Sequence, residues 1–356
     1  MLSYIMMALG WILDIFYRLI GNYGFAIILF TVFIKLVLFP LDLKQRKSMA
    51  KTQKIQPLLM EVQKKYGNDK EKLNQETMKL YQKYGINPMG GCLPMLIQFP
   101  IIIALYWVVK KPIAFMIGVD YSEMWRVAEA FNAWIEANPD AIPAAFEKVS
   151  FPLTYGEKMA NNTFGTYEIQ IAQTIFKHPE ILDHPYITNW DGGAKLANKL
   201  IDFRFFGLDL ADVPNLGAFF GMFTGNVSQL TIDTVLLWII PVLSGFSSWL
   251  SSRISMAQQN KKDKKVILSE AEKPQNAAGA TGDSMKSMML IMPLFSAWFA
   301  FTLPAAVGLY WIISNVIQIL QQTIVTKFLV SDISDEEIEG EIENVRKSRK
   351  NRKKSR

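Results

Sequence analysis

Five stretches of the chain are apolar over most of the length that a membrane-spanning helix needs. A helix crosses the hydrocarbon core of a bilayer with about 20 mostly apolar residues, or slightly fewer where the bilayer is thin. Most of these stretches contain or adjoin a proline, which membrane helices tolerate when neighbouring groups satisfy the freed carbonyls. They occupy residues 25–41, 93–109, 232–250, 288–303 and 305–326. The pattern predicts an all-α integral membrane protein with a five-span core bundle.

Residues 1–21 show a different pattern, in which polar or small residues recur on one face of a helix. Ser3, Gly10, Asp14, Arg18 and Gly21 have this spacing, and Asp14 and Arg18 stand four residues apart, as in a helical ion pair. We therefore expect an amphipathic helix that lies in the membrane interface. The alternative is an additional spanning helix.

Charge alternates between the segments that connect the spans. Residues 42–90 contain 11 basic and 5 acidic residues, whereas residues 110–231 contain 9 basic and 14 acidic residues. Residues 253–286 and the end of the chain are again basic. Short basic loops stay on the cytoplasmic side, so the pattern predicts an N-out, C-in topology. Lys110 and Lys111 fall on the outer side against this trend, and we expect their stems to snorkel to the headgroups.

The soluble segments have recognisable patterns of their own. Two apolar stripes at helical spacing, each ending near a glycine, predict a cytoplasmic helical hairpin at residues 42–90. The enlarged extracytoplasmic loop at residues 110–231 is acidic and aromatic, which favours a small domain. Its two histidines, His178 and His184, flank Asp183; we interpret them as surface residues, and the alternative is a metal site.

The charged tail at residues 327–356 has an acidic part followed by a basic block. Such blocks are usually interaction tails, and the alternative is a solubilising end with no partner. Two polyanions are available on the cytoplasmic side, anionic lipid headgroups and ribosomal RNA. Because five spans already anchor the chain, attraction to lipid would add little, and the block is predicted to contact the ribosome. Its basic residues are Arg346, Lys347, Arg349, Lys350, Arg352, Lys353, Lys354 and Arg356.

Polar residues also recur inside the predicted spans. Lys35 follows Thr31 by one helical turn, near the middle of the first span, where an isolated lysine costs about 3 kcal/mol on insertion scales. No acidic residue lies in a span core as its partner. The polar positions form stripes that predict a shared hydrophilic groove; the alternative is that serines and amides only hold helices together. Besides Thr31 and Lys35 they are Gln98, Ser244, Ser247, Ser248, Trp311, Ser314, Asn315 and Gln318.

Composition narrows the chemistry that the chain can support. Half of its 356 residues are hydrophobic, and Cys92 is the only cysteine, which excludes an internal disulfide and a thiolate metal cluster. The net charge of +6 resides in the loops and the tail, as membrane topology requires, so no DNA partner is expected. We expect no cofactor and no metal.

Three strings of the sequence resemble the YidC-type insertases, the family that includes the mitochondrial Oxa and chloroplast Alb proteins. They are NYGFAIILFTVFIKLVLFPLDLKQRKSM at 22–49, INPMGGCLPMLIQFPIIIALYWVV at 86–109, and MPLFSAWFAFTLPAAVGLYWIISNVIQILQQ at 292–322. The resemblance implies an intramembrane groove whose cation matches Lys35, where the family usually has arginine. It also implies groove roles for Thr31, Gln98 and Trp311.

The function that this resemblance implies is a membrane protein insertase and not an enzyme. Nascent membrane proteins would enter the groove and leave into the lipid of a bacterial cytoplasmic membrane, with or without the Sec translocon. Two other classes remain open from the residues alone. One is an ion or solute transporter that uses the Lys35 cation. The other is an intramembrane hydrolase with Lys35 and one of Ser244, Ser247 or Ser248 as a dyad.

Overall fold

The computed structural model describes residues 2–86, 93–141, 146, 150, 152–154, 163–225, 231–263, 293–328, 340, 342–344 and 347. The chain forms two compact units. One comprises Met1–Ile34, Pro100–Gly245 and Ser296–Ser314, and the other comprises Lys35–Phe99, Phe246–Phe295 and Asn315–Arg356. Helices α2, α5, α13 and α15 each contribute residues to both units.

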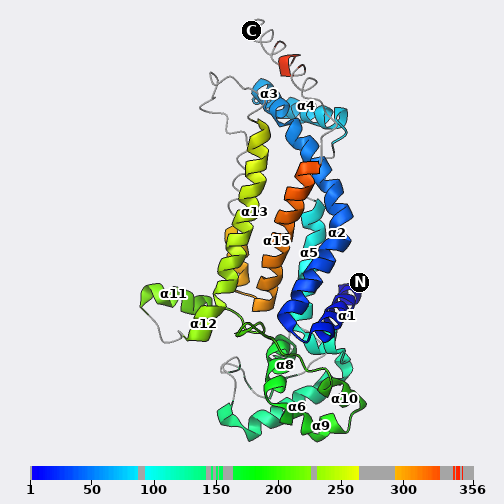
Figure 1. Ribbon diagram of the computed structural model, residues 1–356, viewed down its shortest axis with the longest axis vertical. Helices are drawn as coiled ribbons and strands as arrows, with labels where there is room; N and C mark the ends of the chain where they lie inside the picture. The colour runs from blue at the N-terminus through cyan, green and yellow to red at the C-terminus, as the bar shows by residue number, and fades with distance from the viewer. Residues whose placement is uncertain are drawn as a thin grey trace. The chain divides into compact units, whose positions relative to one another are not determined.

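Helices dominate the described residues, which confirms the predicted all-α class (Figure 1). The α-helices of ten or more residues are α1 (Leu2–Ile20), α2 (Tyr23–Lys54), α3 (Gln56–Tyr66), α4 (Lys70–Lys83), α5 (Leu93–Lys110), α6 (Met124–Ala137), α8 (Glu168–Lys177), α13 (Ile239–Asp263) and α15 (Ala305–Phe328). The shorter α-helices are α7 (Thr163–Thr166), α9 (Pro185–Thr188), α10 (Asp191–Ala197), α11 (Leu216–Thr224) and α12 (Ile232–Leu237). The turns of other helix types are η2 (Ile113–Ile117), η3 (Tyr121–Glu123), η4 (Pro139–Ala141) and η7 (Pro179–Asp183). Residues 293–300 are also helical.

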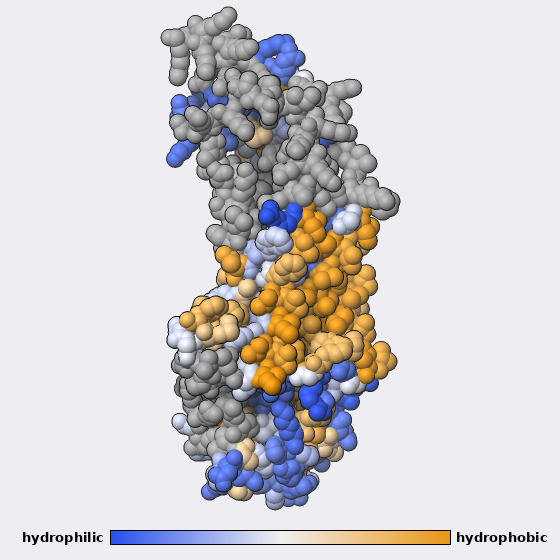
Figure 2. All heavy atoms as spheres, turned by 60° about the vertical axis from the view of Figure 1, so that its left-hand side comes forward, coloured by the Kyte–Doolittle hydropathy of each residue, from blue (hydrophilic) through white to orange (hydrophobic). Residues whose placement is uncertain are grey.

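Three helical segments of the described residues have the length and composition to cross a membrane. They are Ser3–Ile20, Tyr23–Thr52 and Ile232–Ile254, and Phe99–Lys110 is a shorter apolar helix. In the space-filling view of Figure 2, apolar side chains form a band on one face of the molecule. Apolar surface of this kind suits contact with lipid. Part of the segment 288–303, and the side chains of 93–98, lie outside the described residues, and the predicted count of five spans stays a prediction.

In the first unit, α1 lies against η2, and the contact is close. A Cβ atom at Gly10 would come within 2.3 Å of the Phe115 carbonyl oxygen, so only glycine allows this approach. On another face of α1, Tyr4, Trp11 and Leu19 are exposed. The helix therefore has one face covered by protein and one apolar face open to its surroundings.

A short hairpin of β1 (Arg204–Phe205) and β2 (Leu208–Asp209) packs on the first turn of α2. Its turn residues, Phe206 and Gly207, have φ values of 50° and 81°, as a tight two-residue hairpin turn requires. The Phe205 ring covers Gly24, where a Cβ atom would lie 2.1 Å from it. Phe25 makes an edge contact with Phe205 at 5.3 Å.

The segment after this hairpin holds the N-terminus of α15 in the same unit. The amide of Ala305 donates to the carbonyl of Asp212 at 2.9 Å, and the amide of Ala306 donates to the carbonyl of Leu210 at 3.0 Å. These bonds satisfy two amides that would otherwise lack partners at a helix N-terminus. The last long helix is thus positioned from its first turn by Leu210 and Asp212.

In the second unit, α3 and α4 occupy the residues where the two amphipathic arms are predicted. Asp69 caps α4 by accepting a hydrogen bond from the Lys72 amide at 3.1 Å. The apolar stripes of both helices meet in a cluster. Ile55 and Leu58 are fully buried there, and Leu80 is 7% exposed. Each helix therefore covers the apolar face of the other.

Candidate functional site

Lys35 is a buried cation in a helix with the composition of a membrane span. It is 8% exposed and lies within the candidate span Tyr23–Thr52 of α2. In the part of the chain that the structure describes, its ammonium has no carboxylate within 4.0 Å. Its only acidic influence on the same helix is Asp42, two turns further on, which attracts it, whereas Arg46 repels it. Lys35 is thus a cation in apolar surroundings with one acid at a distance.

Asp42 is a residue whose relation to Lys35 the sequence analysis missed. It lies at the start of the predicted cytoplasmic hairpin 42–90, but α2 continues through it to Lys54. The spacing of seven residues, two helical turns, was the available signal. Asp42 places negative charge on the face of α2 that carries Lys35, and Arg46 follows one turn later.

Thr31 is fully buried one turn before Lys35. Its hydroxyl donates to the carbonyl of Ile27 in the preceding turn at 2.6 Å, a bond that threonines in helices commonly form. This hydroxyl is therefore satisfied by its own helix, while its oxygen remains able to accept a bond.

Within the second unit, Asn315 of α15 bonds to two predicted groove serines of α13. Its side-chain amide donates to the hydroxyl oxygens of Ser247 at 3.0 Å and Ser248 at 2.8 Å. Asn315 is 9% exposed and Ser247 is 7% exposed. The bonds join two apolar helices, as the alternative interpretation of these polar residues expects.

Within the first unit, Ser244 is fully buried, and its hydroxyl lies 3.2 Å from that of Ser296. Ser314 is also buried. Trp311 is half-buried, and its ring meets the edge of Phe299 at a centroid distance of 5.7 Å. These contacts show that some predicted groove positions also serve helix packing.

The remaining predicted site residues are two glutamines of the spans and the cations of the tail, and the structure describes the side chains of only some of them. Gln318 of α15 is exposed, so its amide is open to the surroundings of the helix. Gln98 lies in α5, but its side chain is outside the described residues. Of the tail cations, Lys347 is described; it is exposed and pairs with Glu343 at 2.7 Å. The other seven tail cations lie outside the described residues.

Lys111 corrects one expectation, because it does not snorkel to the headgroups. It is 2% exposed, its ammonium donates to the Tyr121 hydroxyl at 3.2 Å, and it lies over the rings of Trp107 and Tyr121. Burial lowers its pKa. The aromatic faces supply the attraction that water would otherwise provide.

Glu168, the first residue of α8, is buried near Lys111. Its carboxylate accepts a hydrogen bond from the Ala114 amide at 2.8 Å, and the residue is 1% exposed. Burial raises its pKa to about 7, against the opposing effects of the Ala114 amide and of Lys111. A carboxyl with this pKa changes charge near neutral pH.

The polar face of α1 is covered by part of the segment 110–231. Asp14 forms the expected pair with Arg18 at 2.9 Å and a second ion pair with Lys199 at 3.0 Å, while it is 4% exposed. The hydroxyl of Tyr17 accepts a hydrogen bond from the Asp202 amide at 2.8 Å. These contacts attach α1 to a segment far along the chain.

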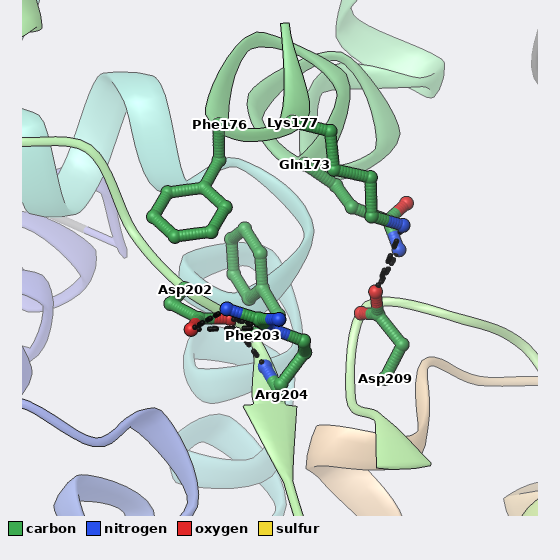
Figure 3. A pocket seen from close by; sticks show the side chains of 7 residues that line it. All are labelled: Gln173, Phe176, Lys177, Asp202, Phe203, Arg204 and Asp209. Atoms are coloured by element: carbon green, nitrogen blue, oxygen red, sulfur yellow. Dashed lines mark hydrogen bonds and ion pairs between the residues drawn. The ribbon is translucent and has the colours of Figure 1, made fainter. Parts of the chain in front are cut away.

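A cavity of about 290 Å³ lies beside this attachment, between α8 and the β1–β2 hairpin (Figure 3). The charged side chains that line the cavity form ion pairs with one another. Arg204 pairs with Asp202 at 2.8 Å, and Lys177 pairs with Asp209 at 3.2 Å. Gln173 also donates to Asp209. The contacts of Lys177 and Gln173 with Asp209 hold the hairpin against α8.

The two histidines have structural partners. His178 pairs with Glu180 at 3.1 Å and lies against the Trp134 ring. His184 caps α9 by accepting a hydrogen bond from the Tyr186 amide at 3.3 Å. Among the described residues, no cluster of three or more metal-ligating side chains is found.

The family model and the similar proteins that match this chain indicate the same family. A model of the family described as 60Kd inner membrane protein matches residues 15–172 and 197–332. A relative from Caldanaerobacter subterraneus subsp. tengcongensis, named membrane protein insertase YidC, is 29% identical over 320 residues, which cover 90% of this chain and 93% of the relative.

Two further relatives with the same name match shorter regions. One from Thioalkalivibrio sulfidiphilus is 47% identical over 113 residues, which cover 32% of this chain and 20% of the relative. One from Fusobacterium nucleatum is 45% identical over 122 residues, which cover 34% of this chain and 58% of the relative. The higher identities are thus confined to about a third of the chain.

Proposed function

Because the chain belongs to the 60Kd inner membrane protein family, the family of the YidC, Oxa and Alb proteins, we propose that it inserts other proteins into the membrane. It is a protein of the bacterial cytoplasmic membrane. The alignment with a relative named insertase over 90% of the chain carries the proposal. The activity proposed is binding and release of a client, with no covalent step.

The physical basis of client capture, in this proposal, is a hydrophilic groove around Lys35. A buried cation with no close carboxylate partner among the described residues attracts an acidic segment strongly, because the surroundings have a low dielectric constant. The polar stripes of α2, α13 and α15, predicted from helical spacing, would lower the cost of holding the polar part of a client inside the membrane. The client's apolar helix would then leave into lipid.

The exposed side chain of Gln318 is available to contact a client, which supports the proposal. The serines of α13 are less available. Ser247 and Ser248 already bind Asn315. Their hydroxyls therefore act first as helix contacts, and a client would have to share or displace them. Lys35, Trp311 and Gln318 are the positions that we propose to meet the client directly.

The proposed topology has five spans, with the N-terminus outside and the C-terminus in the cytoplasm. The alternating charge of the loops supports it. The three described segments with the composition of spans include Ser3–Ile20, which we propose to lie in the interface, because its polar face is held by Lys199 and Asp202 of the outer loop.

The partners that we propose are nascent membrane proteins, lipids, the Sec translocon for some clients, and the ribosome through the basic tail. Reconstitution tests the central claim. Purified protein in liposomes should insert a small single-span client with an acidic translocated segment, measured as protease protection of that segment. Protein-free liposomes are the control. Solute flux without client insertion would instead favour a transporter.

A further inference from the structure

The C-terminal tail packs on the α3–α4 helix pair in the second unit. Ile342 is 6% exposed and belongs to the same buried cluster as Ile55, Leu58 and Leu80. Residues 342–344 are helical. A side chain from beyond the last long helix thus completes the apolar core that α3 and α4 form.

The sequence around Ile342 has the pattern of a short acidic amphipathic helix. Ile338, Ile342 and Val345 recur at steps of four and three residues, which places them on one helical face. The segment 331–343 contains seven acidic and no basic residues. One face is therefore aliphatic and the rest is strongly negative.

The helix pair that receives Ile342 has a small excess of the opposite charge. Residues 55–86 hold six basic and four acidic residues. Lys64 and Lys83 lie in the last turns of α3 and α4, within a few residues of the cluster residues Val62 and Tyr84 along the chain. Apolar contact at the centre and opposite charge around it are the features of a helix-in-groove interface.

We propose that the seam between α3 and α4 is a docking site for the acidic helix of this chain's own tail, residues 335–345, with Ile342 as its anchor. The docked helix covers apolar side chains of the pair and offsets part of its positive charge. It also brings the start of the basic block toward the pair, since Lys347 is joined to Glu343, one turn earlier in the tail, by an ion pair at 2.7 Å. This docking does not depend on insertase activity.

Proteolysis of the full-length protein in nanodiscs tests the contact. A protease that cleaves after glutamate should cut slowly after Glu337 and Glu339 in the wild type. Ile342→Ser should accelerate both cuts by about tenfold, since one buried aliphatic anchor is lost. Asn344→Ser, at an exposed neighbouring position, is the matched control and should change the rates less than twofold.

Each rate is divided by that of a free peptide of the same sequence, which removes the protease's own preference. Equal normalised rates in the wild type and Ile342→Ser would overturn the proposal. So would equal acceleration by both substitutions, because the anchor would then have no special role. Protection that increases with protein concentration would mean docking on a second copy and would contradict docking within one chain.

A labelled peptide of residues 331–347 gives a second, independent measurement. It should bind the full-length Ile342→Ser protein, whose seam is vacated, about tenfold more tightly than the wild type, whose seam is filled. The same peptide with Ile342→Ser should bind neither protein at this affinity. Equal binding of both peptides would show charge attraction alone and would overturn the anchor.

Discussion

The side-chain amide of Asn315 donates a hydrogen bond to the hydroxyl of Ser247 at 3.0 Å, between two helices that are mostly apolar. Both residues were predicted from sequence to line a groove, and the structure gives them a bond to each other. In a membrane such a bond is worth about 0.6 kcal/mol on average. This pair therefore holds α13 and α15 together, whatever else it contacts.

Replacement of either residue of this pair should destabilise the protein modestly. Asn315→Ala and Ser247→Ala are each expected to cost about 1 kcal/mol, because a buried partner is left without its bond. In a double-mutant cycle by unfolding in mixed micelles, the two effects should couple by about 0.5–1.5 kcal/mol. Fully additive effects would mean that the bond contributes nothing to stability.

The charge of Lys35 should decide the insertion of clients with an acidic translocated segment. Lys35→Ala and Lys35→Glu should reduce insertion at least several-fold, whereas Lys35→Arg, which keeps the charge, should be tolerated. The measurement is protease protection of the client, with each variant at the wild-type level in the membrane. Normal insertion by Lys35→Glu would refute the electrostatic basis of client capture.

The exposed side of α15 should meet the client. Photo-crosslinkers at Trp311 and Gln318, which lie seven residues apart on one helical face, should capture a stalled nascent chain. A crosslinker at Ile313, on another face, is the control and should capture much less. Asn315 is a weaker labelling position, because its amide is occupied by Ser247 and Ser248. Similar crosslinking yields at Trp311, Gln318 and Ile313 would contradict the prediction that one face of α15 contacts the client.

Glu168 should make the stability of the segment 110–231 depend on pH. Burial raises its pKa from 4.5 to about 7, so the folded protein binds its proton more tightly than the unfolded chain does. The resulting stabilisation is complete below pH 4.5 and is lost as the pH rises through about 7. The change is at most about 3 kcal/mol.

The neutral variant Glu168→Gln isolates this effect, because its amide oxygen can still accept the Ala114 bond. Thermal unfolding of the wild type should shift to lower temperature between about pH 5 and about pH 8, and Glu168→Gln should show a smaller shift. A variant with the same pH dependence as the wild type would assign the effect to other groups.

The basic block should contribute to ribosome binding. Truncation after Asn344 removes all eight of its cations and Val345, but it keeps the anchor Ile342 of the proposed docking helix. We expect weaker co-sedimentation with ribosomes at low salt and normal membrane integration, since contacts with RNA phosphates weaken as salt rises. Unchanged binding by the truncated protein would point to the lysines of α3 and α4 instead.

The sequence by itself determined the features that depend on local spacing and on transfer from water to lipid. Helical periodicity predicted the polar face of α1, and the Asp14–Arg18 pair is confirmed. Lys35 was identified because a cation within an apolar run is costly wherever the helix packs. The family followed from long strings of residues that occupy one continuous stretch each.

Only the tertiary structure decided what those features touch. Lys199 reaches Asp14 across 185 positions, Lys111 is enclosed by Trp107 and Tyr121, and Ile342 joins the core of α3 and α4. Sequence spacing carries no information on such contacts, because they depend on how the chain returns on itself. The physical reason is that periodicity fixes which face of a helix is polar or apolar, while packing alone selects the partner that covers it.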